Sequence, residues 1–370
     1  MKILILQDFL RGGGTEQQVV FLATYFKKEG HEVVLLTFRP SGRLIGRLAN
    51  SGIHCYSLQK FDLGLSFFAP GIFAALRNEA PDVILCMGRM ANYYAGLIQR
   101  KNREIPVVGS VRTGKKVSVL YRWSLRQVRA IIVNSLWWHN QLERIGVNLD
   151  KVELIYNSMV LSVDRKIDNT ERNRLRSQFC VGPSQCVFLN VANFRKGKRQ
   201  QRLIRIFSRL RGTCDWQLWF LGEGRELRRC QKTARTYGID KQVRFFNFSH
   251  QPRIFYGASD VAVSASVEDS LPNFIIEAQA MGLPVIASDT GGVRESFLPG
   301  GSGLLIPSDD DTSFHRALMH LKANPQLREK FGKEGISYTM KQFSGEKQAR
   351  EVLDLLKRIV EANKLCASSL

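Results

Sequence analysis

Short apolar runs alternate with amphipathic segments along the first half of the chain. Residues 3–6 form an apolar run that predicts a strand, residues 15–29 carry apolar side chains at helical spacing, and residues 32–38 predict a second strand. Thr15 stands where it can cap this helix, and Gly30 stands where it can end it. The order of these elements is typical of βαβ units in a parallel sheet. Four further apolar runs predict buried strands, at residues 83–86, 106–109, 130–133 and 152–156.

The same alternation begins again after a polar stretch at residues 162–177, which is highly charged and poor in apolar side chains. Such a composition predicts a linker or an inserted helix between two halves. The chain is therefore predicted to be α/β, with two doubly wound parallel-sheet domains over residues 1–160 and 175–344. An amphipathic segment at residues 345–364 predicts a final helix that packs on whichever domain lacks cover. The strands predicted in the second half are residues 187–191, 216–221, 243–246, 261–263, 285–287 and 303–306.

A length of 370 residues suits two domains, and a hydrophobic content of 44% excludes a disordered chain. The charge is less ordinary, because 54 Lys and Arg face 33 Asp and Glu, a formal net charge of +21. An excess this large indicates an anionic partner such as nucleic acid, nucleotide phosphates or an acidic membrane surface. Most of it lies in residues 100–129 and 195–235. Aromatic residues accompany the first window, which suits a contact with anionic lipid and a protein core equally well.

Several other features limit the kinds of site the chain can carry. The seven cysteines lack CxxC spacing, so they indicate neither a disulfide framework nor a zinc site and favour a reducing cytoplasm. Residues 309–311, three aspartates, are interpreted as a solvated loop and helix cap rather than a metal site. Residues 1–6 are expected to be a strand rather than a signal peptide, since Asp8 interrupts the apolar run. No apolar run approaches the roughly 20 residues of a membrane-spanning helix, so any membrane contact is expected to be peripheral.

The most specific segment is residues 264–295. A predicted strand ends in a loop that contains Asp269, a helix is expected to open near Asn273, and Glu277 lies within the first turns of that helix. Ligands of open parallel sheets sit beyond the carboxyl ends of the strands, and helix N-termini favour phosphate. Asp269 and Glu277 are therefore predicted to flank a nucleotide site, with one carboxylate near a sugar and the other near ribose.

This segment resembles the E-x7-E motif of family-4 retaining glycosyltransferases, which have the GT-B fold of two Rossmann-like domains facing a cleft. The resemblance implies that Glu277 accepts hydrogen bonds from the ribose hydroxyls and that Asp269 contacts hydroxyls of the donor sugar. Asp269 stands where many relatives carry Glu, and Glu268 competes with it for this role. The backbone groups implied to surround the pyrophosphate are those of Leu271, Asn273 and Phe274.

Residues 191–207 are similar to the strand, loop and helix with which the family neutralises the donor diphosphate. The resemblance places Lys198 on the phosphate-binding lysine and Asn193 on the position of the usual arginine. The leaving group gains negative charge as the glycosidic bond breaks, so it needs fixed cations nearby. Arg195 or Arg199 can compensate for the missing arginine.

Two glycine-containing segments also match the family. Residues 12–33 resemble its N-terminal glycine loop and first helix, which implies that Gly13 and Gly14 approach the donor phosphate. Gly222, which follows a predicted strand, matches a position near the nucleotide base.

Arg112 stands where many relatives have a His close to the reacting sugar. An arginine there can hold an anionic acceptor or the diphosphate, but it cannot act as a base near neutral pH.

The resemblance covers residues 2–359 and implies a metal-independent, retaining hexosyltransferase that uses no cofactor. Its donor would be a nucleotide sugar, with UDP favoured, and its acceptor a glycan or lipid-linked glycan of cell-envelope polysaccharide or lipopolysaccharide synthesis. The C-terminal domain would hold the donor, the N-terminal domain would present the acceptor, and the final helix would cover the N-terminal domain. We expect a cytoplasmic protein whose 100–129 window makes a peripheral contact with the anionic inner face of the membrane.

Two other functions remain open at this point. A net charge of +21 with interleaved aromatic residues is also the footprint of a nucleic-acid-binding protein. No helix-turn-helix, RRM or zinc spacing appears, so a nucleic-acid partner is not expected. A sugar-nucleotide epimerase of the same architecture is the third possibility, and the transferase motifs outweigh it.

Overall fold

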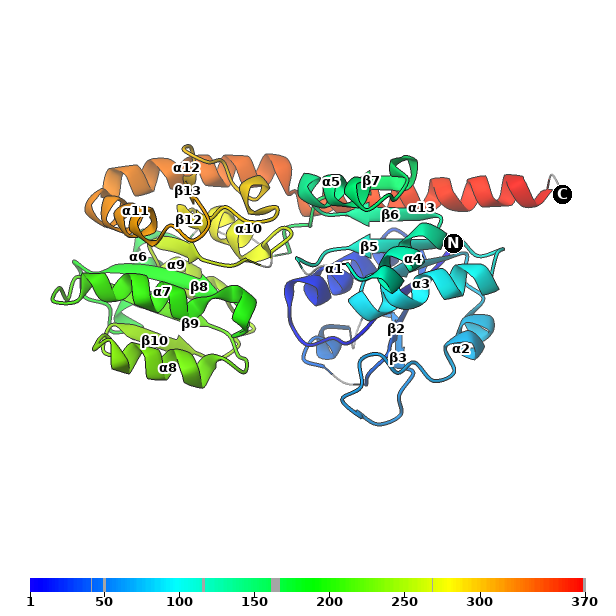
Figure 1. Ribbon diagram of the computed structural model, residues 1–370, viewed down its shortest axis with the longest axis horizontal. Helices are drawn as coiled ribbons and strands as arrows, with labels where there is room; N and C mark the ends of the chain where they lie inside the picture. The colour runs from blue at the N-terminus through cyan, green and yellow to red at the C-terminus, as the bar shows by residue number, and fades with distance from the viewer. Residues whose placement is uncertain (41, 49–50, 115–116, 161–166, 268, 369–370) are drawn as a thin grey trace. The chain divides into compact units, whose positions relative to one another are not determined.

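The computed structural model describes residues 1–40, 42–48, 51–114, 117–160, 167–267 and 269–368. The chain forms two compact units (Figure 1). The first unit is Met1–Val160 together with Gly345–Leu370, and the second is Leu161–Ser344. Glu268, the residue that competes with Asp269 in the sequence motif, lies outside the described residues.

The first unit is built on a seven-stranded parallel sheet in the order β3-β2-β1-β4-β5-β6-β7. The strand order reverses between β1 and β4, as in doubly wound folds. Every strand predicted in this half is present, and β3 is an edge strand that the pattern missed because none of its residues is fully buried. The strands are β1 (Lys2–Gln7), β2 (Glu32–Thr37), β3 (His54–Ser57), β4 (Val83–Cys86), β5 (Val107–Val111), β6 (Ala130–Val133) and β7 (Val152–Leu154).

Helices cover both faces of this sheet, because alternate strand residues bury apolar side chains on opposite sides. α1 and α13 pack on one face, and α2, α3, α4 and α5 pack on the other. In α13 the predicted stripe that includes Val352 and Leu356 is buried in the core of the first unit. The helices are α1 (Gly14–Lys28), α2 (Ile72–Glu79), α3 (Arg89–Lys101), α4 (Val119–Gln127), α5 (Leu136–Arg144) and α13 (Gly345–Ser368).

The N-terminal end of α1 differs from the prediction, and its C-terminal end agrees with it. Gly13, not Thr15, occupies the N-cap, with extended backbone and no side-chain cap, so Thr15 lies inside the first turn. Gly30 ends the helix as predicted, with a φ of +81° that favours glycine. The prediction for Thr15 was wrong because a glycine backbone can begin a helix without a capping side chain.

The second unit contains a six-stranded parallel sheet in the order β10-β9-β8-β11-β12-β13, with the reversal between β8 and β11. All six predicted strands are present. They are β8 (Cys186–Val191), β9 (Trp216–Leu221), β10 (Val243–Phe246), β11 (Val261–Ser264), β12 (Val285–Ser288) and β13 (Gly303–Ile306). The helices are α6 (Asn169–Gln178), α7 (Gln200–Phe207), α8 (Leu227–Thr236), α9 (Arg253–Ala258), α10 (Asn273–Ala280), α11 (Asp311–Ala323) and α12 (Pro325–Gln342).

The described part of the charged stretch at 162–177 is mostly helix α6, and it packs within the second unit. Asp168 caps the helix by accepting from the backbone N–H of Glu171 at 2.8 Å. Arg172 and Arg176 both bind the carboxylate of Asp260, at 2.7 and 2.9 Å. Because that partner lies far along the chain, a segment that resembles a linker in sequence is part of the folded second unit.

Among the residues that the structure describes, no helix is both long enough and apolar enough to span a lipid bilayer.

Candidate active site

The loops that follow β8 and β11 meet at the point where the strand order of the second unit reverses. After β8, a short 3₁₀ helix at Lys196–Lys198 leads into α7. The carbonyl of Gly197 accepts hydrogen bonds from the backbone N–H of Val267 at 2.9 Å and the hydroxyl of Ser266 at 3.1 Å. The two loops are therefore tied together where ligands of doubly wound sheets bind.

Lys198 and Asp269 form an ion pair at this junction, with Nζ 2.5 Å from Oδ1. Both side chains are largely buried. Burial alone would raise the pKa of Asp269, but the charge and hydrogen bond of Lys198, a hydrogen bond with Ser266 and the charge of Arg195 hold that pKa below its ordinary value. The second carboxylate oxygen, Oδ2, is buried and has no hydrogen-bond partner among the described residues. An ionised carboxylate thus has an acceptor position that the folded chain leaves unused.

Glu277 lies in α10, which begins at Asn273, directly after Pro272. The hydroxyl of Tyr256 donates to Oε2 of Glu277 at 2.7 Å. Burial disfavours the charged carboxylate more than this hydrogen bond favours it, and the pKa of Glu277 rises to about 7. Tyr256 comes from α9 and its ring stacks on Phe274, with centroids 6.3 Å apart. Sequence reasoning did not find Tyr256, since only the fold brings α9 beside α10.

The raised pKa of Glu277 makes the stability of the protein depend on pH. The folded chain binds a proton at Glu277 up to about pH 7, whereas an ordinary glutamate loses it near 4.5. Stability contributed by this site is therefore present below pH 4.5 and is lost as pH rises to 7. We expect Glu277→Gln to melt several degrees above the wild type at pH 8 and close to it at pH 4.5, in calorimetry at both pH values. Glu334→Gln, an exposed control on α12, should show no such difference, and a destabilised Glu277→Gln at pH 8 would contradict the expectation.

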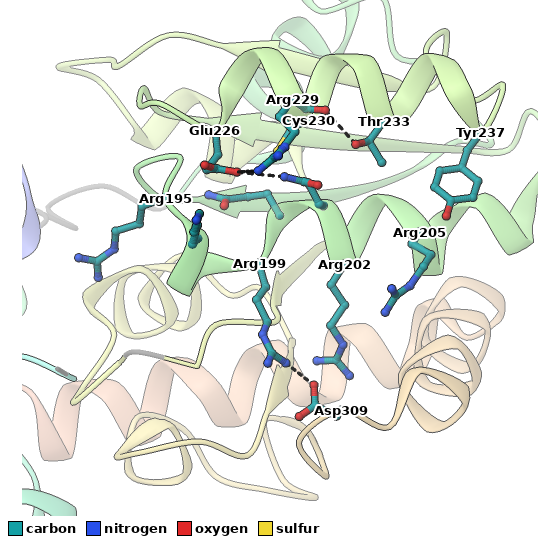
Figure 2. A pocket seen from close by; sticks show the side chains of 13 residues that line it. Arg195, Arg199, Arg202, Arg205, Glu226, Arg229, Cys230, Thr233, Tyr237 and Asp309 are labelled. Carbon is teal, nitrogen blue, oxygen red and sulfur yellow. Dashed lines mark hydrogen bonds and ion pairs between the residues drawn. The ribbon is translucent and has the colours of Figure 1, made fainter. Parts of the chain in front are cut away.

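Arg195 and Arg199, the two candidates to replace the missing phosphate-binding arginine, have different surroundings in the structure. Arg199 has a φ of +50° and forms an ion pair with Asp309. Arg195 is exposed, and Figure 2 shows its side chain pointing away from the Arg199–Asp309 pair. Its charge also acts on Asp269, as the lowered pKa of that carboxyl indicates. Asn193 is exposed, and its carbonyl accepts from the side chain of Gln200 at 3.2 Å. The geometry therefore favours Arg195 over Arg199.

Much of the second basic window lines a hollow of about 490 Å³ between α7 and α8 (Figure 2). The acidic run at residues 309–311 neutralises part of this charge. Asp310 caps α11 by accepting from the N–H of Ser313 at 2.8 Å, as predicted. Asp311 is not simply solvated, because it accepts from Arg202 at 2.7 Å and Arg205 at 2.8 Å. Among the described residues, no three His, Cys, Asp or Glu side chains lie together in a way that could hold a metal ion.

The other residues predicted to bind the donor lie in the loop after β9 and around the start of α10. Gly222 has a φ of +148°, and a Cβ there would lie 2.2 Å from the carbonyl oxygen of Ala192. Only glycine therefore allows the loop after β9 to approach the loop after β8 this closely. Leu271 is buried ahead of α10. Asn273 and Phe274 are the first two residues of α10, where backbone N–H groups have no partner within the helix.

Arg112 belongs to the first unit, where it follows β5. Its Nε donates to Oγ of Ser110 at 2.7 Å, and its Nη1 donates to Oδ1 of Asn157 at 2.6 Å. Nδ2 of Asn134 donates to the same oxygen of Asn157 at 3.2 Å. Burial lowers the pKa of Arg112 to about 10, so the guanidinium is still charged at neutral pH. Side chains in β5 and after β6 and β7 thus hold one cation at the carboxyl edge of the sheet.

Gly13 and Gly14 form the start of α1 in the first unit. The side chain of Gln18, one turn later, donates to the carbonyl of Ser158 at 2.5 Å and accepts from its N–H at 2.8 Å. The start of α1 is thereby joined to the loop after β7. Sequence reasoning did not single out Gln18, because a glutamine inside a helix carries no local signal. The approach of Gly13 and Gly14 to a donor phosphate stays a prediction.

The chain matches known proteins along most of its length. Residues 12–162 match the family model described as Glycosyltransferase Family 4, and residues 172–338 match the model described as Glycosyl transferases group 1. The chain therefore belongs to the family-4 type of glycosyltransferases, as the motifs predicted. Its two Rossmann-like parallel sheets are those of the GT-B fold.

Individual relatives match different shares of the chain. It is 32% identical to the lipopolysaccharide core biosynthesis glycosyltransferase LpsE of Rhizobium meliloti, over 46% of this chain and 49% of that protein. It is 24% identical to the N-acetyl-alpha-D-glucosaminyl L-malate synthase of Bacillus anthracis, over 66% and 62%. The chain thus spans about half to three fifths of the length of these relatives. The crystal structure of Anabaena HepE in complex with UDP has a TM-score of 0.82 at 18% identity, covering 97% of this chain and 100% of that one.

Proposed function

We propose that this protein is a retaining hexosyltransferase that moves a sugar from a nucleotide-sugar donor to a glycan or lipid-linked acceptor. The observation that carries this proposal is the Lys198–Asp269 ion pair, which lies at the strand-order reversal in the same unit as Glu277 on α10. A cation, a sugar-binding carboxylate and a helix N-terminus are the groups that a nucleoside diphosphate sugar requires. The lipopolysaccharide relative supports a role in cell-envelope polysaccharide or lipopolysaccharide synthesis.

In this proposal the second unit binds the donor. Glu277 accepts hydrogen bonds from the ribose hydroxyls, and the unused oxygen of Asp269 accepts one from a hydroxyl of the donor sugar. Lys198 and Arg195 neutralise the diphosphate, and the first N–H groups of α10 complete its surroundings. Gly222 lies near the base. UDP is the favoured nucleotide, and the UDP complex of the structurally similar Anabaena protein supports that choice.

The proposed reaction keeps the configuration of the transferred sugar. The acceptor hydroxyl attacks the anomeric carbon on the face from which the nucleoside diphosphate departs, so the new glycosidic bond replaces the broken one on the same side. The departing phosphate oxygen takes the acceptor proton, and no protein base is needed. Lys198, Arg195 and the N-terminus of α10 supply the positive potential that stabilises the leaving group. This potential takes the place of a divalent metal ion. No cofactor takes part.

The first unit is proposed to present the acceptor. Arg112 is a fixed cation at the carboxyl edge of its sheet, suited to a phosphorylated glycan or to the acceptor end of a lipid diphosphate. We propose that the protein works in the cytoplasm, at the inner face of the membrane where such acceptors are exposed.

A thermal-shift screen with UDP-, GDP- and ADP-sugars tests the donor assignment. A ligand that binds only the folded state stabilises it by RT ln(1 + [L]/Kd), so the correct donor raises the melting temperature of the wild type. Glu277→Ala should lose most of that shift, because the ribose hydroxyls lose their acceptor. Glu334→Ala, on the exposed side of α12, should keep it. The absence of a shift with every nucleotide sugar would refute the proposal.

A further inference from the structure

One loop of the first unit exposes an unusual number of large apolar side chains. Residues 58–71 join β3 to α2, and in Figure 1 this loop extends beyond the end of β3. Scattered exposed apolar residues are normal on protein surfaces, but five within eight residues form a patch. Their exposed fractions are 69% for Phe61, 56% for Leu63, 40% for Leu65, 58% for Phe67 and 42% for Phe68.

The polar contacts of the loop are made on its inner side. Nε2 of the buried Gln59 donates to the carbonyls of Leu65 and Phe68, both at 2.7 Å. The hydroxyl of Tyr94, on α3, donates to the carbonyl of Phe67 at 2.8 Å. These bonds hold three carbonyls of the loop toward the body of the first unit. The apolar side chains are therefore presented outward by a loop with a defined backbone, which lowers the entropy cost of inserting them into a partner.

Basic side chains accompany the apolar ones. Arg39 binds Asp62, the acidic residue of the loop, through two nitrogens at 2.7 and 2.8 Å. Arg11 and Arg39 both lie over the ring of Phe9, and the ammonium group of Lys60 lies 5.7 Å from the ring centroid of Phe61. Three cations thus face one carboxylate at this patch, so its net charge is positive.

A second exposed apolar pair lies outside this loop. Val119 and Leu120, at the start of α4, are 74% and 58% exposed. Ser118 hydrogen-bonds the hydroxyl of Tyr93 at 2.7 Å, and Tyr93 is next to the Tyr94 that holds Phe67. The 58–71 loop follows β3, and the segment that leads into α4 follows β5, so both leave the parallel sheet at its carboxyl edge, as Arg112 does. By contrast, Tyr121 and Trp138, aromatics of the same region, are buried in the core.

We infer that the 61–68 loop, together with Val119 and Leu120 at the same edge of the sheet, is the element through which the protein inserts into the interface of an acidic phospholipid membrane. Phe and Leu side chains with a basic rim are complementary to acyl chains beneath anionic headgroups. The sequence predicted a membrane contact through the whole 100–129 window. The inference assigns that contact to two residues of the window, at the start of α4, and to a loop outside the window. The inference rests on the proposed function only in placing a lipid-linked acceptor at that membrane.

Vesicle flotation with the full chain tests this inference. The probes are vesicles of phosphatidylglycerol mixed with phosphatidylcholine and vesicles of phosphatidylcholine alone. The wild type should float with the acidic vesicles and less with the neutral ones. Phe61→Ser/Phe67→Ser/Phe68→Ser should weaken partitioning into acidic vesicles by at least about tenfold, since each exposed ring loses its apolar burial. Leu298→Ser/Met319→Ser/Met340→Ser, which removes exposed apolar side chains of the second unit, should float like the wild type.

Three results would overturn the inference. The first is a wild type that floats with neither vesicle, and the second is a loop variant that floats like the wild type. The third is a wild-type dimer in sedimentation without lipid that the loop variant abolishes, which would make the patch an interface between two copies. A nucleotide-sugar thermal shift on the same proteins keeps the questions apart, because the loop variant should retain the wild-type shift. If the loop variant loses vesicle binding and keeps the nucleotide-sugar shift, the loop acts in membrane binding and not in donor binding.

Discussion

Lys198→Ala is expected to lower kcat by about 10²- to 10³-fold, the usual cost of removing one group that stabilises charge developing in a transition state. Lys198 is held 2.5 Å from Asp269 in a largely buried position, so its ammonium group is already placed before the diphosphate begins to leave. The donor KM should change less than kcat, because the charge on the leaving group is greatest in the transition state. Steady-state kinetics with varied donor concentration measure both constants.

Lys322→Ala is the matched control for this variant. Lys322, itself largely buried, also forms an ion pair in the second unit, with the partly exposed Asp215, but it lies on α11 away from the β8 and β11 loops. Its loss should lower the melting temperature without the fall in kcat. An equal fall in both variants, or a rise in KM alone for Lys198→Ala, would assign Lys198 a structural or simple binding role.

The same kinetic assay of the wild type in the presence of EDTA checks the proposed metal independence. The wild-type rate should not change.

Arg112→Ala is expected to lower kcat/KM by about 100-fold, through the loss of a preorganised cation. Ser110 and Asn157 occupy two of the guanidinium nitrogens, so the group cannot swing away from its position after β5. Arg112→Lys should not restore the activity, because a lysine carries the charge but cannot make both hydrogen bonds in one plane. Transfer assays that vary the acceptor measure the effect.

Arg126→Ala provides the comparison within the same basic window. Arg126 is exposed, and it donates to the carbonyls of Ile145 and Gly146 rather than to side chains at the carboxyl edge. Its removal should leave kcat/KM within about twofold of the wild type, as for most surface substitutions. Similar losses in Arg112→Ala and Arg126→Ala would mean that the window acts through its total charge and not through one placed arginine.

The elements themselves were largely readable from the chain. A buried parallel strand such as β9 is a short apolar run, and it appears with the predicted bounds. β3 was missed because none of its four residues is fully buried and they form no apolar run. The sequence alone does not decide between a linker and a helix for α6, because the salt bridges that neutralise Arg172 and Arg176 depend on Asp260, more than 80 residues away.

The sequence by itself identified the family, because the motifs that contain Lys198, Asp269 and Glu277 resemble those of its members. The roles of these three residues in a donor site stay predictions. Only the tertiary structure showed that Arg199 pairs with Asp309, that Tyr256 lies against Glu277, and which aromatic residues of the first unit are buried and which are exposed. Each of these depends on contacts between segments far apart in the chain. Local patterns record the period of an element, whereas the partner of a charge and the exposure of a ring are set by what the fold packs beside them.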